Sequence, residues 1–235
     1  MSAVKDCVKR HTTYNLRRAI HDIGTEGLLC FRHWSALRKA PRFLRKRPLK
    51  LNLGCGPNRK PGWLNIDLFD SAADLQLDLR KRWPFAEGSA AYIYSEHVFE
   101  HFEFLQEVPH ILSESLRVLQ NGGVFDVGVP DTEWPLHAYG TPDHECWQLA
   151  PKWHPETCET QLDHINYHFR QGEQHKYAWD EETLTRSLKR SGFVCIVRRP
   201  FDATLDCESR RIGTLYMRAI KPPLVALPGQ ATPVR

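Results

Sequence analysis

The 235-residue sequence lacks the long apolar segments that would place it inside a membrane. It contains no run of about 18 or more apolar residues, and its N-terminus lacks the basic, apolar and small-residue regions of a secretory signal peptide. The seven cysteines are odd in number and form no Cys-x-x-Cys pair, so a disulfide framework is not indicated. We therefore expect a reduced, cytoplasmic protein.

Acidic residues are scarce at the N-terminus. Residues 1–50 hold 13 Lys and Arg but only 3 Asp and Glu, whereas the rest of the chain holds 19 and 25. The domain behind the basic segment is therefore acidic, while a nucleic-acid enzyme is more often basic around its cleft. We expect no nucleic-acid partner.

The basic segment, residues 1–48, is predicted to be a helical arm followed by a linker. Apolar residues at positions 16, 19, 20 and 23 indicate an amphipathic helix, which Gly24 and Gly27 should interrupt before a second helical stretch. Residues 1–47 can pack on the domain, form a homodimer with a second subunit, or make a peripheral contact with anionic lipid. The sequence leaves these alternatives open.

Strand and helix patterns alternate after the arm, as is typical of an α/β domain with a mostly parallel sheet and helices on both faces. The domain is predicted to span residues 49–222, with a substrate lid or insertion at 131–179 and a Pro-rich tail at 223–235. Strands are expected at 49–54, 63–68, 73–79, 90–98, 124–130, 193–200 and 213–222, and helices at about 109–120 and 181–191.

A glycine turn joins the first two expected strands in "LKLNLGCGPNRKPGWLNIDL". A dinucleotide site requires a third glycine where this chain has Arg59, and Pro57 breaks the turn that would start a helix beneath a pyrophosphate. This argues against NAD. The turn can instead receive a zwitterionic amino-acid tail, with Asp67 accepting hydrogen bonds from ribose hydroxyls and Asp78 from an adenine amino group.

The stretches "LNLGCG", "NIDL", "LDL", "SEHVFEH" and "LRVLQNGG" resemble, in order and spacing, the class I S-adenosylmethionine-dependent methyltransferases, and the type 11 group in particular. The resemblance covers about residues 49–221 and implies a Rossmann-like seven-stranded sheet behind the N-terminal helical arm. The chain departs from the pattern in one place. Only residues 57–63 separate the glycine turn from the second strand, so the first helix of the fold is nearly absent.

The resemblance implies S-adenosyl-L-methionine as the cofactor and assigns residues to each part of it. Asp67 would bind the ribose, and Ser95 and Glu96 would lie near the sulfonium. The methionine part would be surrounded by Leu53, Gly54, Cys55 and Gly56, and the adenine flanked by Asp78 and Leu79.

Candidate catalytic residues follow the fourth and fifth strands. Methyl transfer to a hydroxyl requires removal of a proton, and histidine is the natural base near neutral pH. His97 and His101 would share a face if their segment is helical. Asp131 is the other candidate for the acceptor pocket, and the Trp- and His-rich lid suits a ring-bearing or sugar-like acceptor or, alternatively, a satellite core.

Two sets of residues in the lid also offer metal-ligand types, although their spacing matches no common zinc motif and we assign no metal. One set is His144, Cys146, His154 and Cys158, and the other is Asp163, His164 and His168.

We therefore expect a methyltransferase that acts on a small molecule, most simply by O-methylation of a sugar or other hydroxylated metabolite. The Asn/Asp-Pro-Pro-Tyr/Phe tetrapeptide common in amino-group methylases of nucleic acids is absent. The alternative is a non-catalytic scaffold of the same fold, which docks a partner or a membrane through its arm.

Overall fold

The computed structural model describes residues 13–44, 48–142 and 144–223. The expected tail at 223–235 and the first part of the arm lie almost entirely outside these residues. Within them, no helix is both long enough and apolar enough to cross a bilayer.

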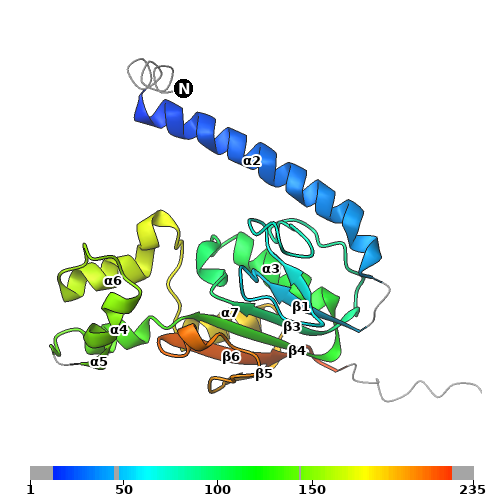
Figure 1. Cartoon of the computed structure of the whole chain (residues 1–235). Coiled ribbons are helices and arrows are strands. Elements are labelled where there is room, and N and C mark those ends of the chain that lie inside the picture. The colour runs from blue at the N-terminus through cyan, green and yellow to red at the C-terminus, as the bar shows by residue number, and fades with distance from the viewer. Residues whose placement is uncertain (1–12, 45–47, 143, 224–235) are drawn as a thin grey trace, which may run out of the picture.

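A six-stranded sheet with the order β2-β1-β3-β4-β6-β5 forms the centre of the domain (Figure 1). The pairs β1–β2, β1–β3 and β3–β4 are parallel, whereas β6 runs antiparallel to both β4 and β5. The strands are β1 (Leu49–Leu53), β2 (Leu64–Ile66), β3 (Ala90–Glu96), β4 (Leu119–Pro130), β5 (Val194–Arg198) and β6 (Thr214–Ile220).

The sheet has one strand fewer than the seven expected. The segment predicted as a strand at 73–79 pairs with β2 only through the isolated bridge between Ile66 and Leu75. Asp74 turns its carboxylate back onto the backbone N–H of Asn65 at 2.8 Å. Leu75, Leu77 and Leu79 of this segment pack in the core, but the segment forms no further strand pairing. Apolar alternation indicates a side-chain pattern, not a pairing partner.

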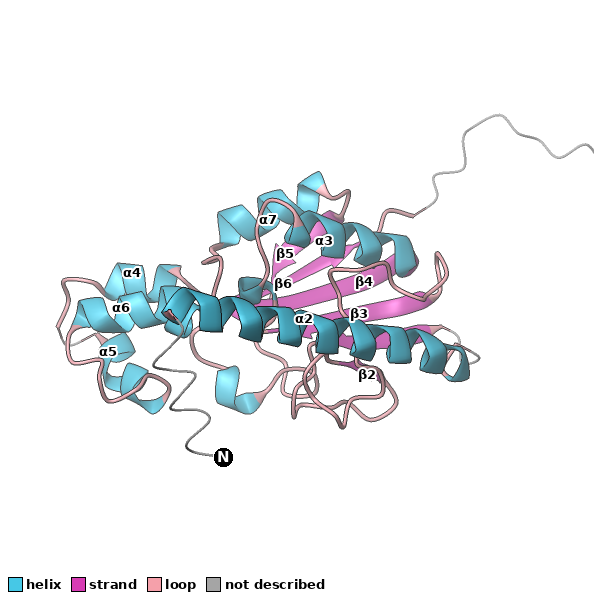
Figure 2. Cartoon of the chain, turned by 90° about the horizontal axis from the view of Figure 1, so that it is seen from above, coloured by secondary structure: helices cyan, strands magenta, loops and turns pink. Residues whose placement is uncertain are grey.

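The helical elements fall into an arm, a sheet-covering pair and a lid group (Figure 2). The arm is α2 (Tyr14–Lys39) with η1 (Ala40–Arg42), and the sheet-covering pair is α3 (Glu107–Val118) and α7 (Glu181–Arg190). The lid contains α4 (Glu133–Ala138), α5 (Glu145–Leu149), η3 (Ala150–Lys152), α6 (Gln161–Arg170) and η4 (Gln171–Glu173), and short turns lie at η2 (Phe99–His101) and η5 (Glu208–Arg210).

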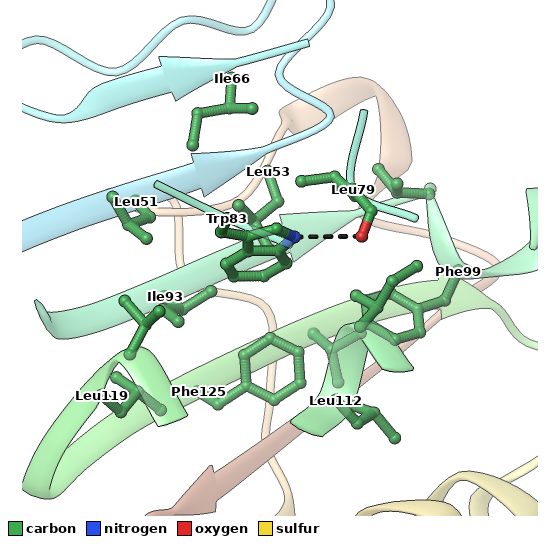
Figure 3. Packing of buried hydrophobic residues seen from close by; sticks show 14 of the residues in the cluster. Leu51, Leu53, Ile66, Leu79, Trp83, Ile93, Phe99, Leu112, Leu119 and Phe125 are labelled. Atoms are coloured by element: carbon green, nitrogen blue, oxygen red, sulfur yellow. Dashed lines mark hydrogen bonds between the residues drawn. The ribbon is translucent and has the colours of Figure 1, made fainter. Parts of the chain in front are cut away.

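The main core lies between the sheet and helices α3 and α7 (Figure 3). Leu51, Ile93 and Phe125 come from three neighbouring strands and are fully buried. Trp83 packs beside them and donates its indole N–H to the Leu79 carbonyl at 3.0 Å, so its one polar atom is satisfied. Apolar side chains at alternate strand positions therefore face this layer of helices.

The other face of the sheet is polar and aromatic. Asp126 is fully buried there and accepts hydrogen bonds from Arg218 Nε and Nη2 at 2.8 and 2.7 Å. Trp63 packs edge-on against Tyr92 of β3, with ring centroids 5.2 Å apart. Because the connection between β1 and β2 is so short, loop side chains such as Trp63 cover this face where a helix would otherwise lie.

The arm forms one continuous helix, so the expected break at Gly24 and Gly27 is wrong. A glycine costs about 1 kcal/mol in a helix interior, which neighbouring residues can offset. The C-terminal half of α2 is attached to the domain. Arg32 donates to the Leu68 carbonyl at 3.1 Å, and Ala36 belongs to the core.

Candidate functional site

The glycine turn follows β1 directly and is tied to the end of β2. Gly54 and Gly56 have φ angles of 62° and 46°, in the left-handed region that glycine adopts most easily. The Gly56 N–H donates to Asp67 Oδ2 at 2.9 Å. Asp67 Oδ1 accepts from the backbone N–H groups of Phe69 and Asp70 at 2.8 and 2.9 Å. The turn and Asp67 therefore form one rigid unit.

This unit lines a pocket of about 770 Å³, which we call the turn pocket. Of the predicted site residues, the turn pocket brings together Gly54, Gly56, Asp67, Asp78, Leu79, His97 and His101. Its other walls come from the segment after Asp67, from the turn after β3, from the end of the lid and, through Leu29, from the arm.

Asp78 reaches the turn pocket but already has a charged partner. Its Oδ1 accepts from Arg80 Nε at 2.9 Å and its Oδ2 from Arg80 Nη2 at 2.9 Å. The burial of Asp78 would raise the pKa of its carboxyl, but the hydrogen bonds from Arg80 outweigh this and leave that pKa below its ordinary value. An adenine amino group would share this carboxylate with Arg80.

Four of the residues assigned to the cofactor do not line the turn pocket. Leu53 is fully buried in the core, and burial raises the pKa of the Cys55 thiol to about 12. Ser95 is also fully buried, and its hydroxyl has no hydrogen-bond partner among the described residues. Glu96 accepts from the hydroxyl of Tyr216 at 3.0 Å. The positions of these four beside the glycine turn and strand end are as expected, but their contact with a cofactor stays a prediction.

Glu96 instead positions Arg210, a pocket residue that was not predicted. Arg210 Nη1 donates to the Glu96 carbonyl at 2.9 Å and lies 3.6 Å from Glu96 Oε2. Arg210 comes from η5, more than a hundred residues later in the chain. It lines the turn pocket and also a second pocket, described below. No local motif marks it.

The segment after β3 is a single 3-10 turn, not a longer helix. His97 has a φ of 55°, which is unusual for a residue with a side chain, and its N–H donates to the Gly128 carbonyl at 2.8 Å. Within this turn, Glu100 Oε1 lies 3.8 Å from His97 Nδ1 and 3.9 Å from His101 Nε2. The two predicted histidines therefore converge on a common carboxyl group.

Both histidines are neutral near pH 7. Burial lowers the pKa of His97 well below its ordinary value, and the positive charge of Arg210 lowers it further. Burial also lowers the pKa of His101. A neutral imidazole can accept a proton or bind a metal ion, so these side chains are in the state that either role requires.

A second pocket of about 270 Å³ lies under the lid, and we call it the lid pocket. Trp134, Trp147, Trp153 and Tyr167 give it an aromatic lining. The same pocket is lined by five histidines, namely His97, His154, His164, His168 and His175. The lid therefore contributes a surface suited to a partly polar ring.

Asp131 lies outside both pockets. It is 6% exposed, and its Oδ2 accepts from Arg198 Nη2 at 2.9 Å. Its Oδ1 accepts from the backbone N–H of Glu133 at 3.1 Å. In this position Asp131 links the end of β4 to β5 and α4, and a role in the acceptor pocket stays a prediction.

The two predicted sets of metal-ligand types are regrouped by the fold. His144 Nδ1 accepts from the Cys146 N–H at 3.1 Å and caps α5. His154, Cys158 and His164 lie close together in the lid, and Glu100, His101 and His175 form a second such group. None of the three residues of the second group belongs to the predicted sets, and His101 was predicted only as a candidate base.

Residues 55–127 match a family model described as a methyltransferase domain. The search of curated proteins found no relative of the chain. Similar solved structures include a SAM-dependent methyltransferase, a possible histamine N-methyltransferase, from Thermotoga maritima (14% identity, 87% of this chain and 97% of that one, TM-score 0.45). A SAM-dependent methyltransferase from Archaeoglobus fulgidus is also similar (12% identity, 81% and 94%, TM-score 0.47).

A third similar structure is phosphoethanolamine N-methyltransferase 2 of Haemonchus contortus in complex with S-adenosyl-L-methionine (12% identity, 80% of this chain and 52% of that one, TM-score 0.46). At these identities and TM-scores, none of the three says which acceptor this chain uses.

Proposed function

We propose that the chain is a class I S-adenosylmethionine-dependent methyltransferase and that it methylates a hydroxyl oxygen of a small molecule, such as a sugar, held in the lid pocket. The observation that carries the proposal is the position of His97. It lines both the turn pocket and the lid pocket, so it stands where a methyl donor and an acceptor would meet.

The residues of the turn pocket suit S-adenosyl-L-methionine. The backbone at Gly56 leaves room for a close approach, because a Cβ there would meet no heavy atom within 4 Å. The carboxylate of Asp67 uses three of its roughly four acceptor positions on backbone N–H groups. The remaining position can accept from a ribose hydroxyl, while Leu79 and Phe69 supply apolar surface for adenine. When bound, the cofactor supplies an activated methyl group.

His97 would take the proton that the acceptor hydroxyl loses. Its Nε2 lies 2.8 Å from the Thr214 hydroxyl. In the tautomer whose Nε2–H donates to Thr214, Nδ1 keeps its lone pair and is the atom that can accept the proton. Burial raises the pKa of the Glu100 carboxyl, 3.8 Å from Nδ1, to about 8, so this group would stabilise the imidazolium only once it has lost its own proton.

The aromatic lining of the lid pocket favours a sugar-like or other ring-bearing acceptor. Flat aromatic faces bind the apolar faces of rings, and neutral histidines can donate to or accept from hydroxyl groups. We keep residues 131–179 as the proposed substrate lid within a domain of residues 49–222.

The proposal is tested by incubating the full chain with S-adenosyl-L-methionine and matched panels of hydroxylated and amine-bearing small molecules. We expect S-adenosylhomocysteine to form with hydroxylated acceptors, and an O-methyl signal in the product by NMR. Methylation of amines alone would overturn the choice of oxygen but not the methyltransferase assignment.

A separate proposal concerns the arm. The outer face of α2 carries exposed apolar side chains, among them Ile20, Ile23 and Phe31 at 60%, 73% and 63% exposure. Such a face suits a homodimer or a peripheral membrane contact, and it would also serve the alternative scaffold function. Sedimentation of the full chain with anionic vesicles tests the membrane contact, and analytical ultracentrifugation tests the homodimer. A monomer that does not bind vesicles would contradict both contacts.

A further inference from the structure

Glu100 places a carboxyl group beside His97 and His101, although Glu100 itself lines neither pocket. The residue is 2% exposed, and its Oε2 atom has no hydrogen-bond partner among the described residues. Its Oε1 atom lies 3.8 and 3.9 Å from the nearby His97 and His101 nitrogens, too far for hydrogen bonds. A buried carboxyl in this state is costly unless it is protonated or meets a cation.

The two cationic side chains nearby are already paired with other carboxylates. Arg210 lies 3.6 Å from Glu96 Oε2 and donates to the Glu96 carbonyl. Lys176 donates its backbone N–H to the Glu100 carbonyl at 2.7 Å, but its Nζ lies 3.3 Å from Glu107 Oε2. No described Lys or Arg is ion-paired with the Glu100 carboxyl.

Two histidines beside Glu100 are oriented by backbone carbonyls. His101 Nδ1 lies 3.1 Å from the Gln174 carbonyl, and His175 Nδ1 lies 2.8 Å from the His168 carbonyl. A carbonyl can only accept, so each Nδ1 carries the hydrogen and each Nε2 keeps its lone pair. Metal-binding histidines are held in this way, because the second hydrogen bond fixes the tautomer and the ring.

These ligand atoms converge. One atom from each of Glu100, His101 and His175 lies within 4.8 Å of the others, and the two imidazole rings are 5.1 Å apart at an angle of 73°. Two imidazoles and a carboxylate are a donor set that Zn²⁺ and similar divalent ions take with open coordination positions. We propose that Glu100, His101 and His175 bind one divalent transition-metal ion, for which Zn²⁺ is the probe.

The place of this site gives the ion a role that rests on the proposed function. His101 lines the turn pocket and His175 lines the lid pocket, so the ion would lie where donor and acceptor meet. An open coordination position can hold an acceptor oxygen and make its proton easier to remove. His97 is not one of the three ligands and remains available as the base.

A competing group in the lid must be separated from this one. The ligand atoms of His154, Cys158 and His164 also lie within 4.8 Å of one another. In that group, however, the Nδ1 atoms of the two histidines are 2.9 Å apart and satisfy each other by a hydrogen bond. Cys158 makes the two groups distinguishable by spectroscopy, because a thiolate ligand gives Co²⁺ an intense near-ultraviolet charge-transfer band.

The test is calorimetric titration of Zn²⁺ into the metal-free full chain, without cofactor or acceptor. We expect one ion per chain, at least about tenfold weaker binding in Glu100→Gln and His175→Ala, and unchanged binding in Cys158→Ser. With Co²⁺ we expect visible absorption without a thiolate band. Absence of binding, equal binding by His175→Ala, or loss in Cys158→Ser would overturn the proposal.

Thermal unfolding of each metal-free variant shows whether it folds. If Glu100→Gln does not fold, His175→Ala decides the question, because His175 is only partly buried. Binding is measured apart from methyl transfer, so a chain that binds no metal can still be an O-methyltransferase. Equally, a chain that methylates only amines can still bind the ion.

Discussion

The imidazole Nε2 of His97 lies 2.8 Å from the hydroxyl of Thr214, which joins the end of β3 to the start of β6. The backbone N–H of His97 also donates to Gly128 of β4. Thr214 of β6 therefore holds the ring, and Gly128 of β4 holds the backbone that carries it. This fixation accounts for a φ of 55° at a residue with a side chain and keeps the ring between the two pockets.

His97→Ala should lower kcat about 100-fold or more, because general base catalysis typically contributes that much. Cofactor affinity should change little, since the turn pocket keeps its glycine turn and Asp67. Thr214→Val, which removes only the hydroxyl that orients the ring, should lower kcat by less, about tenfold. Steady-state rates with calorimetry of S-adenosylhomocysteine measure both effects, and a fully active His97→Ala would exclude this base.

Gly54→Ala and Gly56→Ala form a matched pair. A Cβ at Gly54 would clash with Val98 Cγ2, whereas a Cβ at Gly56 would meet no heavy atom within 4 Å. Both positions have positive φ, so both variants should lose about 1–2 kcal/mol from backbone strain. Only Gly54→Ala should lose about 1–3 kcal/mol more from overpacking. Urea unfolding measures the difference, and equal losses would contradict the close approach of Val98.

Asp67→Ala should abolish measurable binding of S-adenosylhomocysteine and also lower stability. Three backbone N–H groups would lose their acceptor, each hydrogen bond contributing about 1 kcal/mol or more. Asp67→Asn keeps one acceptor oxygen and should retain most of the stability while still binding more weakly. Calorimetry and denaturant unfolding separate the two effects; an Asn variant with wild-type affinity would contradict a ribose contact.

The lid should lose stability in acid. Burial and, to a smaller extent, the adjacent His164 lower the pKa of His154 from an ordinary value of 6.5 to about 4. Between these pH values the native state binds fewer protons than the unfolded state, so the free energy of unfolding should decrease as pH falls from 6.5 to about 4.

His154→Gln should flatten this dependence, whereas the same change at the exposed His137 should not. Thermal unfolding across the pH range, with a chelator present, provides the measurement. Identical slopes in wild type and His154→Gln would show that His154 does not titrate differently on folding.

Much of the fold could be predicted from local chemistry. The helix expected at 181–191 is present, and Asp180 begins it by accepting the Thr183 N–H at 2.7 Å. The first strand was also placed correctly, because Leu49, Leu51 and Leu53 alternate with polar residues and are all buried. The helices of the lid were not predicted. They are short and pack over a partly polar surface, so too few apolar residues recur at the helical spacing to indicate a helix.

The site was predictable only where one motif supplies several contacts. The glycine turn and Asp67 lie 11 residues apart and are linked by a hydrogen bond, so a single stretch of sequence contains both. Leu29 and Arg210 reach the same pocket from opposite ends of the chain, and only the tertiary fold brings them there. The burial of Glu100 could not be predicted either, because nothing in the sequence distinguishes it from an exposed acidic residue.

The sheet order has a consequence for how the protein assembles. β6 lies between β4 and β5, so the last strand in the sequence is internal, and the pairing of Asp126 with Arg218 closes a loop that contains the entire lid. The strands behind the turn pocket pair over short separations, as Leu53 does with Ile66. Closing the longer loop costs more entropy. We therefore expect β1 and β2, which lie behind the turn pocket, to form early in folding, and the pairing of β6 with β4 to form late. Pulse-labelled hydrogen exchange during refolding would show β1 and β2 protected before β6.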